Sequence, residues 1–323
     1  MPRQISAGIR ACSKRIMDIL DLKSCRLCPR ECGVDRTKGI KGACGATDKI
    51  IAARASLHHW EEPCLSGNNG SGTVFFSGCN LSCVYCQNKE ISHGGKGVEV
   101  STDRLCEIFF ELRDLGAHNI NLVTAGHLLP QVLIAVEQAK KNGINLPFVY
   151  NSSGYEHAEA LKRCDGLIDI YLPDFKYINM DTARRYSKAA DYPEIAKAAI
   201  AEMVRQHPQC VFDDEGIMKR GVIVRHLMLP DRLSESKQAI KYLYETYGDS
   251  IYISIMSQYT PIGDLKNYPE LQKRISQKDY DELIDYAIGL GVENAFIQEG
   301  TAADESFIPD FSGQGIEVEY GNK

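Results

Sequence analysis

Three cysteines, Cys79, Cys83 and Cys86, stand in a C-x3-C-x2-C arrangement within the run SGCNLSCVYCQN. Thiolates are the soft ligands that iron–sulfur clusters require, and three of them on one loop can hold three corners of a cubane cluster. Such a site leaves the fourth iron open to a substrate, whereas a structural zinc site normally closes with four protein ligands. A zinc knuckle with a distant fourth ligand, or three unrelated core cysteines, are the alternative interpretations.

A second group of cysteines lies nearer the N-terminus, in a glycine-rich segment. Its members are Cys25, Cys28, Cys32 and Cys44. On spacing alone, four thiolates suit a tetrahedral zinc ion or a second iron–sulfur cluster equally well. The segment could also pack against the rest of the protein without metal. The sequence therefore predicts at most one auxiliary metal site here and leaves these alternatives open.

Charge and composition exclude several classes of protein. The chain has 323 residues, a net charge of −6 and 44% hydrophobic residues, as ordinary folded proteins have. The acidic balance disfavours a nucleic-acid-binding surface. No apolar run approaches the roughly 20 residues of a membrane-spanning helix, and the N-terminal residues lack a signal-peptide pattern. We therefore expect a cytoplasmic protein without a membrane partner, whose twelve cysteines are reduced.

From residue 73 onward, short runs of β-forming residues alternate with helical patterns. Several runs are apolar at successive positions, which is typical of parallel strands covered on both faces. This order predicts an α/β fold with a parallel sheet, open or closed. Strands are expected at 73–78, 120–124, 147–151, 168–174, 222–229, 251–257 and 294–299, and amphipathic helices at 101–116, 234–247 and 276–290.

Two segments depart from this alternation. Residues 1–72 are rich in cysteine and glycine and show little periodicity, and residues 177–220 insert a helical pattern followed by a hairpin around residues 213–216. We therefore expect a Cys-rich N-terminal extension over residues 1–72. A core over residues 73–300 contains the 177–220 insertion, and residues 301–323 form a C-terminal tail.

The cysteine triplet after the first strand of this β/α series resembles the motif of the radical S-adenosylmethionine (SAM) superfamily, with Tyr85 as its aromatic residue. The fuller run GCN-x2-C-x2-CQN, with HHWEEPCLSG and CxxCPxxC before it, is similar to relatives of the pyruvate formate-lyase activating enzyme. The resemblance extends from about Cys25 to Glu299. It implies a partial (β/α)6 TIM-like barrel that binds a [4Fe-4S] cluster through the three cysteines and SAM through the fourth iron.

The resemblance also implies the reaction. Reductive cleavage of SAM would give a 5'-deoxyadenosyl radical that abstracts a hydrogen atom from a substrate, for example from a glycine of a partner glycyl radical enzyme. Radical modification of another peptide or of a small molecule is the alternative within this chemistry. A non-enzymatic iron–sulfur or zinc protein is the alternative outside it. Flavodoxin or ferredoxin would be the electron donor.

SAM contacts are expected where strands end, because the carboxyl ends of parallel strands carry the site in such barrels. The Gly-Gly-Glu stretch of many relatives is replaced by Thr124-Ala125-Gly126-His127, so that Thr124, His127 or backbone carbonyl groups would bind the amino group. For His127, a role in the turn before the next helix is the alternative. Asn151 and Ser153 match a polar strand-end segment of the family, Gln258 is a further candidate, and Tyr85 completes the motif.

Three charged residues complete the expected SAM site. Asp174 and Lys176 are similar to a D-x-K element of glycyl-radical activases, and their i,i+2 spacing points both side chains the same way. A surface ion pair is the alternative. Arg225 interrupts an apolar strand and needs a partner, either the SAM carboxylate or a buried protein carboxylate. The segment that contains Glu62 is expected to line the barrel, with Glu62 as a candidate for contact with the active site.

Overall fold

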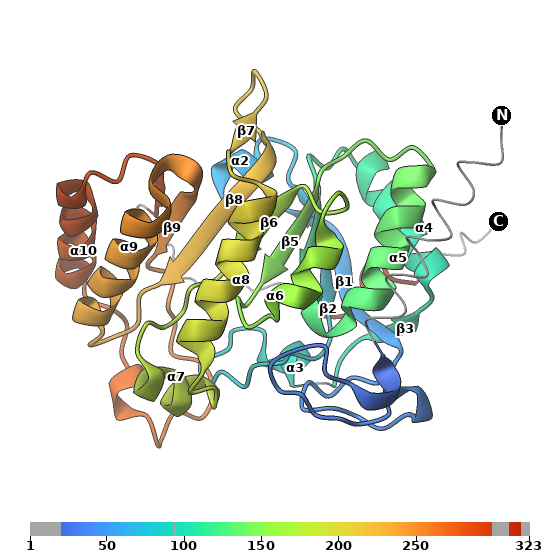
Figure 1. The fold of residues 1–323 in the computed structure, drawn as a ribbon, viewed down its shortest axis with the longest axis horizontal. Coiled ribbons are helices and arrows are strands. Elements are labelled where there is room, and N and C mark those ends of the chain that lie inside the picture. Colours follow the sequence, from blue (N-terminus) through green and yellow to red (C-terminus); the bar gives the residue numbers. More distant parts are fainter. Residues whose placement is uncertain (1–20, 94, 299–309, 318–323) are drawn as a thin grey trace.

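One open sheet, most of it parallel, forms the centre of the fold (Figure 1). The computed structural model describes residues 21–93, 95–298 and 310–317. The strands are β1 (Ile50–His58), β2 (Ser71–Phe76), β3 (Val98–Val100), β4 (Ile120–Val123), β5 (Phe148–Ser152), β6 (Ile170–Pro173), β7 (Val211–Phe212), β8 (Met218–Leu227), β9 (Tyr252–Met256) and β10 (Ala295–Ile297).

The order of the strands gives a partial barrel. It runs β10-β9-β8-β6-β5-β4-β2-β1-β3, with parallel pairing from β10 to β2 and antiparallel pairing of β1 with β2 and β3. Within the described residues no ladder joins β10 to β3, so the sheet stays open. The strands of the middle, such as β4 and β5, are buried at every position, which explains their largely apolar character.

Helices cover one face of this sheet. In Figure 1, α4, α5, α6, α8, α9 and α10 lie in front of the strands. Among the described helices, none combines the length and the apolar character that a membrane span requires. The helices are α2 (Pro63–Ser66), α3 (Lys89–Ser92), α4 (Thr102–Asp114), α5 (Leu129–Lys141), α6 (Ala158–Leu161), α7 (Met180–Ser187), α8 (Tyr192–Gln206), α9 (Leu233–Tyr247) and α10 (Gln277–Leu290). Short 3-10 turns lie at Leu22–Ser24, Arg36–Lys38, Gly126–Leu128, Lys162–Cys164, Gly248–Ser250 and Pro269–Leu271.

The two ends of the sheet carry different elements. At the carboxyl ends of the parallel strands lie α3, α7 and the N-terminal segment of residues 21–49, which form the lower edge in Figure 1. At the amino ends lie α2 and the hairpin of β7 and β8, which form the upper edge. The hairpin expected around residues 213–216 is therefore present, and it lies away from the carboxyl ends.

All seven strands and all three helices expected from the sequence are present, with boundaries shifted by at most a few residues. β1 was not expected from the sequence, because it lies inside the segment with little periodicity. Its sequence, IIAARASLH, holds three alanines, which are poor strand formers, and the strand exists because it pairs with β2. In the segment of residues 177–220, α8 serves as the crossover between the neighbouring strands β6 and β8.

A buried carboxyl group lies beyond the end of β5. Glu156 is 4% exposed and accepts a hydrogen bond of 2.9 Å from the Ser152 hydroxyl. Burial raises the pKa of Glu156 to about 7, against the effect of that hydrogen bond. The folded protein therefore keeps a proton that the unfolded chain loses at lower pH, and stability falls as pH rises through the pKa of the folded state.

We expect Glu156→Gln to remove this pH dependence. Between about pH 6 and pH 8, the free energy of unfolding of the wild type should fall by roughly 1.4 kcal/mol more than that of the variant, given 1.36 kcal/mol per pH unit for one proton. Anaerobic denaturation at both pH values measures the difference. Glu159→Gln is the control, because Glu159 is exposed and pairs with exposed Lys162. Parallel pH profiles for the wild type and Glu156→Gln would contradict the prediction.

Candidate functional site

The loop that carries the cysteine triplet follows β2 directly. Cys79, Cys83 and Cys86 are partly buried, and each of the first two has a hydrogen-bond donor on its sulfur. Burial raises the pKa of the Cys79 thiol, and the neighbouring thiols of Cys83 and Cys86 raise it further. A cationic cluster would offset the shift at Cys79, because it binds the thiolate and releases the thiol proton. Metal binding by the three sulfurs stays a prediction.

No group of three or more His, Cys, Asp or Glu side chains among residues 21–93, 95–298 and 310–317 is arranged to hold a single metal ion. In a cubane cluster each cysteine binds a different iron, so the sulfurs lie farther apart than the ligands of one ion.

Gly78 fixes the path of the cysteine loop. Its φ of 93° lies in the region that favours glycine, and a Cβ there would lie 2.7 Å from the Cys44 carbonyl oxygen and 2.9 Å from His127 Nε2. The backbone N–H of Cys79 donates to that carbonyl at 3.2 Å. The His127 ring nitrogen lies 2.8 Å from the Ser77 carbonyl oxygen, and His127 is 2% exposed. This placement favours a positioning role for His127 over the expected contact with SAM.

Tyr85 also lies within the protein. It is 5% exposed, its hydroxyl lies 2.7 Å from the Tyr177 hydroxyl, and its ring meets Tyr186 and Tyr259 edge to face. Burial raises its pKa well above the usual range. The structure thus shows Tyr85 as a packing residue that anchors the loop between Cys83 and Cys86.

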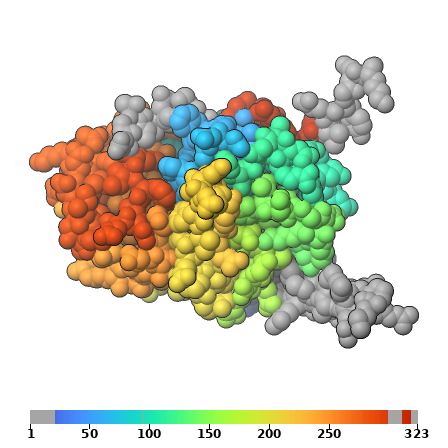
Figure 2. All heavy atoms as spheres, turned by 90° about the horizontal axis from the view of Figure 1, so that it is seen from above, coloured from blue at the N-terminus to red at the C-terminus, as the bar shows by residue number. Residues whose placement is uncertain are grey.

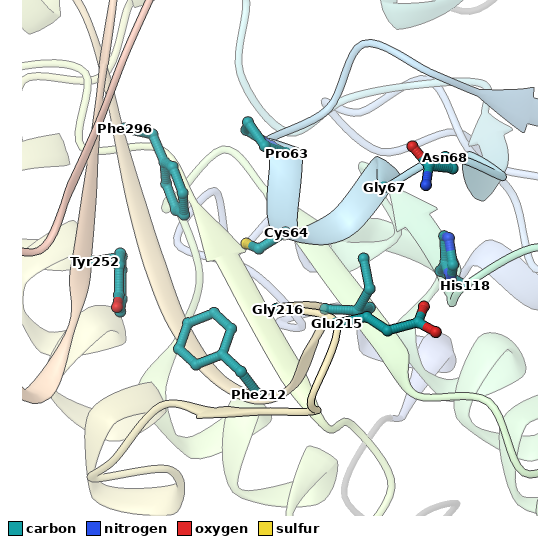
Figure 3. A pocket seen from close by; sticks show the side chains of 11 residues that line it. Pro63, Cys64, Gly67, Asn68, His118, Phe212, Glu215, Gly216, Tyr252 and Phe296 are labelled. Carbon is teal, nitrogen blue, oxygen red and sulfur yellow. The ribbon is translucent and has the colours of Figure 1, made fainter.

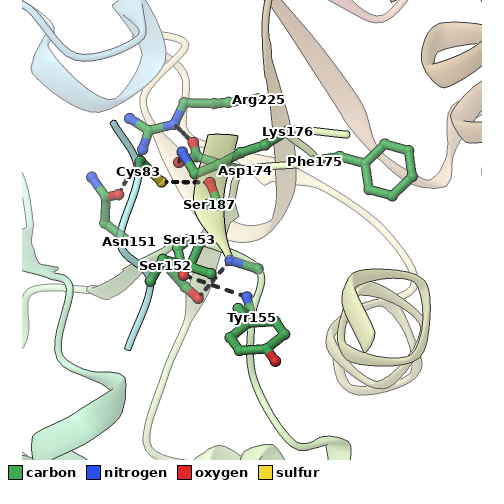
Figure 4. Close-up of polar contacts among 12 residues, drawn as sticks. Cys83, Asn151, Ser152, Ser153, Tyr155, Asp174, Phe175, Lys176, Ser187 and Arg225 are labelled. Atoms are coloured by element: carbon green, nitrogen blue, oxygen red, sulfur yellow. Dashed lines mark hydrogen bonds and ion pairs between the residues drawn. The ribbon is translucent and has the colours of Figure 1, made fainter. Parts of the chain in front are cut away.

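Arg225 is the centre of a polar network at the carboxyl ends of the strands (Figure 4). Its Nε donates to Asp174 at 2.9 Å and its Nη2 donates to Asn151 Oδ1 at 2.7 Å. Its Nη1 lies 3.4 Å from Glu61. The buried protein carboxylate, the second partner considered for Arg225, is therefore present, and these contacts use three of the five guanidinium N–H groups.

Asp174 and Lys176 point to the same place, as their spacing predicted. Lys176 Nζ lies 2.5 Å from Asp174 Oδ2, and both side chains are about 15% exposed. Burial alone would raise the pKa of Asp174, but Arg225 and Lys176 hold it below its usual range. Lys176 also acts on the Cys83 thiol, whose pKa it lowers against the effect of burial. The pair is partly buried beside the cysteine loop, which argues against a surface ion pair.

Glu61 and Glu62 enter this network from the segment after β1. Asn121 Nδ2 donates to Glu61 at 3.0 Å, and Glu62 is 8% exposed. Burial raises the pKa of both carboxyl groups, and Arg225 opposes that shift. Glu62 was the candidate of this segment for contact with the active site, whereas Glu61 makes the direct contact with Arg225.

The other expected SAM contacts lie at the same strand ends. Thr124 follows β4 and has a φ of 59°, a strained value for a β-branched residue that is common at functional sites. Ser153 follows β5, and its carbonyl oxygen lies 2.9 Å from the Tyr192 hydroxyl, which also contacts Asp174. Gln258 follows β9, and its carbonyl oxygen accepts a bond of 3.1 Å from Gln87. Thr124, Ser153 and Gln258 are partly exposed.

The N-terminal cysteines form a second group of neighbours. Cys25, Cys28 and Cys44 are buried, and a Cβ at Gly42 would lie 3.4 Å from the sulfur of Cys32 and 3.7 Å from that of Cys44. Burial raises the pKa of the Cys28 thiol to about 12, and the thiols of Cys44 and Cys32 add to that shift. Metal binding by this group stays a prediction.

We expect this group to bind metal beyond the four irons of one cubane cluster. Metal analysis of anaerobically purified protein should find zinc or further iron, and Cys28→Ala should lose that metal while four irons stay. Cys64→Ala is the control, because Cys64 is buried and belongs to neither group. A wild type with four irons and no other metal would count against the auxiliary site.

A cavity of about 380 Å³ lies at the opposite end of the fold, between α2 and the β7–β8 hairpin (Figure 3). Figure 2 shows the two segments next to each other on the face seen from above, the hairpin in yellow and α2 in blue. The lining of the cavity combines aromatic side chains, such as Phe212 and Tyr252, with polar ones, such as His118 and Glu215. None of the residues expected to hold the cluster or SAM lines it.

Comparison with known proteins places these features in a family. Residues 73–212 match the family model described as the radical SAM superfamily. A curated relative, an uncharacterised protein of Methanocaldococcus jannaschii, is 29% identical over 272 residues, which cover 82% of this chain and 74% of the relative.

Two solved structures are similar at low sequence identity. Streptococcus suis SuiB bound to the precursor peptide SuiA has a TM-score of 0.47 at 10% identity, over 69% of this chain and 47% of that one. The FeFe-hydrogenase maturase HydG from Carboxydothermus hydrogenoformans has a TM-score of 0.48 at 13% identity, over 73% of this chain and 55% of that one. This chain thus spans about half the length of these structures. Residues 73–212 are therefore similar to the radical SAM superfamily, whose members use a [4Fe-4S] cluster and SAM.

Proposed function

We propose that this protein cleaves SAM reductively at a cluster held by Cys79, Cys83 and Cys86 and abstracts a hydrogen atom from a substrate. When bound, the cluster and SAM together supply one electron and the 5'-deoxyadenosyl radical. The observation that carries this proposal is the meeting of the three thiols with charged and polar strand ends on one edge of the sheet. Lys176 connects the two sets, since its ammonium group acts on both Asp174 and Cys83.

The residues of the chain would bind and orient SAM. We assign the SAM carboxylate to the two remaining N–H groups of Arg225 and to Lys176, because cations with several donors suit a carboxylate. Asp174 and the hydroxyl or carbonyl groups of Thr124 and Ser153 would accept hydrogen bonds from the SAM amino and ribose groups. Asn151 would act mainly through Arg225, which donates a hydrogen bond to it. Gln258 would lie at the edge of the SAM site.

The substrate proposed is a glycine of a partner protein, as in the action of glycyl radical activating enzymes. Two features support it. The run GCNLSCVYCQN and the D-x-K element are similar to those of the activating enzymes. The hairpin of residues 211–220 lies at the amino ends of the strands, so it does not cover the edge where the cysteines lie. Flavodoxin or ferredoxin is the proposed electron donor.

The cleavage reaction is tested by its product. Anaerobically reconstituted protein with SAM and dithionite should form 5'-deoxyadenosine and methionine, and omission of dithionite should abolish both. Protein that carries four irons but forms no 5'-deoxyadenosine, with or without a soluble protein fraction of its host, would overturn the proposal.

The glycine substrate is tested separately by isotope transfer. A host protein fraction whose glycines carry deuterium at Cα should transfer deuterium to 5'-deoxyadenosine and develop a glycyl radical signal in electron paramagnetic resonance (EPR). A fraction with deuterated alanine is the control. Cleavage of SAM without deuterium from glycine would overturn the glycine substrate and leave the cleavage reaction standing.

A further inference from the structure

The last turn of α7 lies against the cysteine loop. The backbone N–H of Val84 donates to the Tyr186 carbonyl oxygen at 2.9 Å. The hydroxyl of Ser187, the next residue, lies 3.0 Å from the sulfur of Cys83 (Figure 4). Ser187 is fully buried, so water does not compete for this contact. Ser187 belongs to no motif in the sequence.

Two tyrosines extend this contact into a chain of hydroxyl groups. The Tyr177 hydroxyl lies 2.7 Å from Ser187 Oγ, and the Tyr85 hydroxyl lies 2.7 Å from the Tyr177 hydroxyl. A metal-bound thiolate only accepts hydrogen bonds, so the Ser187 proton must point to the sulfur. Tyr177 then donates to Ser187, and Tyr85 donates to Tyr177. Three O–H dipoles thus point toward one cluster ligand, and each bond polarises the next.

Arg30 holds Ser187 in place from the N-terminal segment. Its guanidinium donates to the carbonyl oxygens of Ser187 at 3.1 Å, Lys188 at 2.6 Å and Asn80 at 2.9 Å. It also stacks over the Tyr155 ring at 5.2 Å. The end of α7 and the cysteine loop are therefore joined by one side chain, which fixes the distance between Ser187 and Cys83.

We propose that Ser187 is a positioning residue whose hydrogen bond to the Cys83 sulfur raises the reduction potential of the cluster, with Tyr177 and Tyr85 strengthening that bond. The inference rests on the proposed function, because it needs the cluster at these cysteines. The physical reason is that reduction adds negative charge to the cluster and its sulfurs. A donor on the sulfur stabilises the reduced state more than the oxidised one.

The test is a potentiometric titration of the cluster, followed by EPR, in anaerobic protein without SAM. At a fixed potential, Ser187→Ala should lower the ratio of reduced to oxidised cluster about tenfold, which is a shift of about 59 mV for one electron. Tyr177→Phe leaves the Ser187 hydroxyl in place and should lower the ratio in the same direction by about two- to threefold. A role for Ser187 in folding alone would leave the potential unchanged.

The matched control is Ser71→Ala. Ser71 is also fully buried, but its hydroxyl bonds to Asn119 at the amino end of β2, far from the cysteine loop. We expect the cluster of Ser71→Ala to have the same reduction potential as the cluster of the wild type. Equal potentials for the wild type and Ser187→Ala, at equal iron content, would overturn the inference and leave the proposed function intact. Wild-type protein that assembles no cluster would overturn both.

Discussion

Arg225→Met is expected to lower the free energy of unfolding by about 3–5 kcal/mol, the usual cost of removing one partner from a buried ion pair. The guanidinium is shared by Asp174 at 2.9 Å and Glu61 at 3.4 Å, and no more than 16% of any of these side chains is exposed. Without Arg225, Lys176 still neutralises Asp174, but Glu61 and Glu62 lose the cation that opposes the rise of their pKa values. Chemical denaturation under anaerobic conditions measures the loss.

Two further variants separate the charge effect from lost packing. Arg225→Met combined with Glu61→Gln should recover part of the stability, since the double variant removes one of the unpaired carboxylates. Arg184→Met is the control for an exposed pair, because Arg184 and Asp181 are 62% and 83% exposed, and it should cost less than about 1 kcal/mol. Equal losses for Arg225→Met and for the double variant would show that charge pairing in this network contributes little.

The parallel sheet could be predicted from the sequence because its strands are buried on both faces. The runs INLV of β4 and FVYNS of β5 are largely apolar, so that the sequence alone indicates buried strands there. The carboxyl-end position of Asn151, Asp174 and Arg225 followed from the same order of strands, and these three side chains do meet. An Arg inside an apolar run was a reliable signal, since a buried charge must have a partner.

The remaining features depend on chain paths that no local pattern encodes. Glu61 reaches Arg225 because β1 runs antiparallel to β2 and ends beside the amino end of β2, so that the following segment enters the network from that end. Ser187 reaches Cys83 because α7 ends beside the cysteine loop. A serine at the end of a helix gives no sequence signal for such a contact. His127 was expected near SAM because of its position after β4, but its ring turns to the Ser77 carbonyl. Packing between distant segments decided each of these contacts.

Cys83→Ala is expected to lower the rate of 5'-deoxyadenosine formation at least about 10³-fold. This loss is a small part of the rate enhancement that enzymes typically achieve. Cys83 is the middle ligand of the triplet, and the alanine leaves one iron of the cluster without its thiolate. Iron analysis and the visible absorbance of the reconstituted variant should show loss of the cluster. Product formation is measured with SAM and dithionite, as for the wild type.

Two alanine variants decide whether that loss is specific. Cys106 is a buried cysteine of α4, so Cys106→Ala should keep the cluster and the activity while costing stability at most. Cys28→Ala should keep four irons and the cleavage of SAM, because the catalytic cluster is assigned to the loop after β2. If activity instead depended on Cys28 and survived in Cys83→Ala, the reducing cluster would belong to the N-terminal segment. The polar strand ends around Arg225 would then face a loop without a catalytic role.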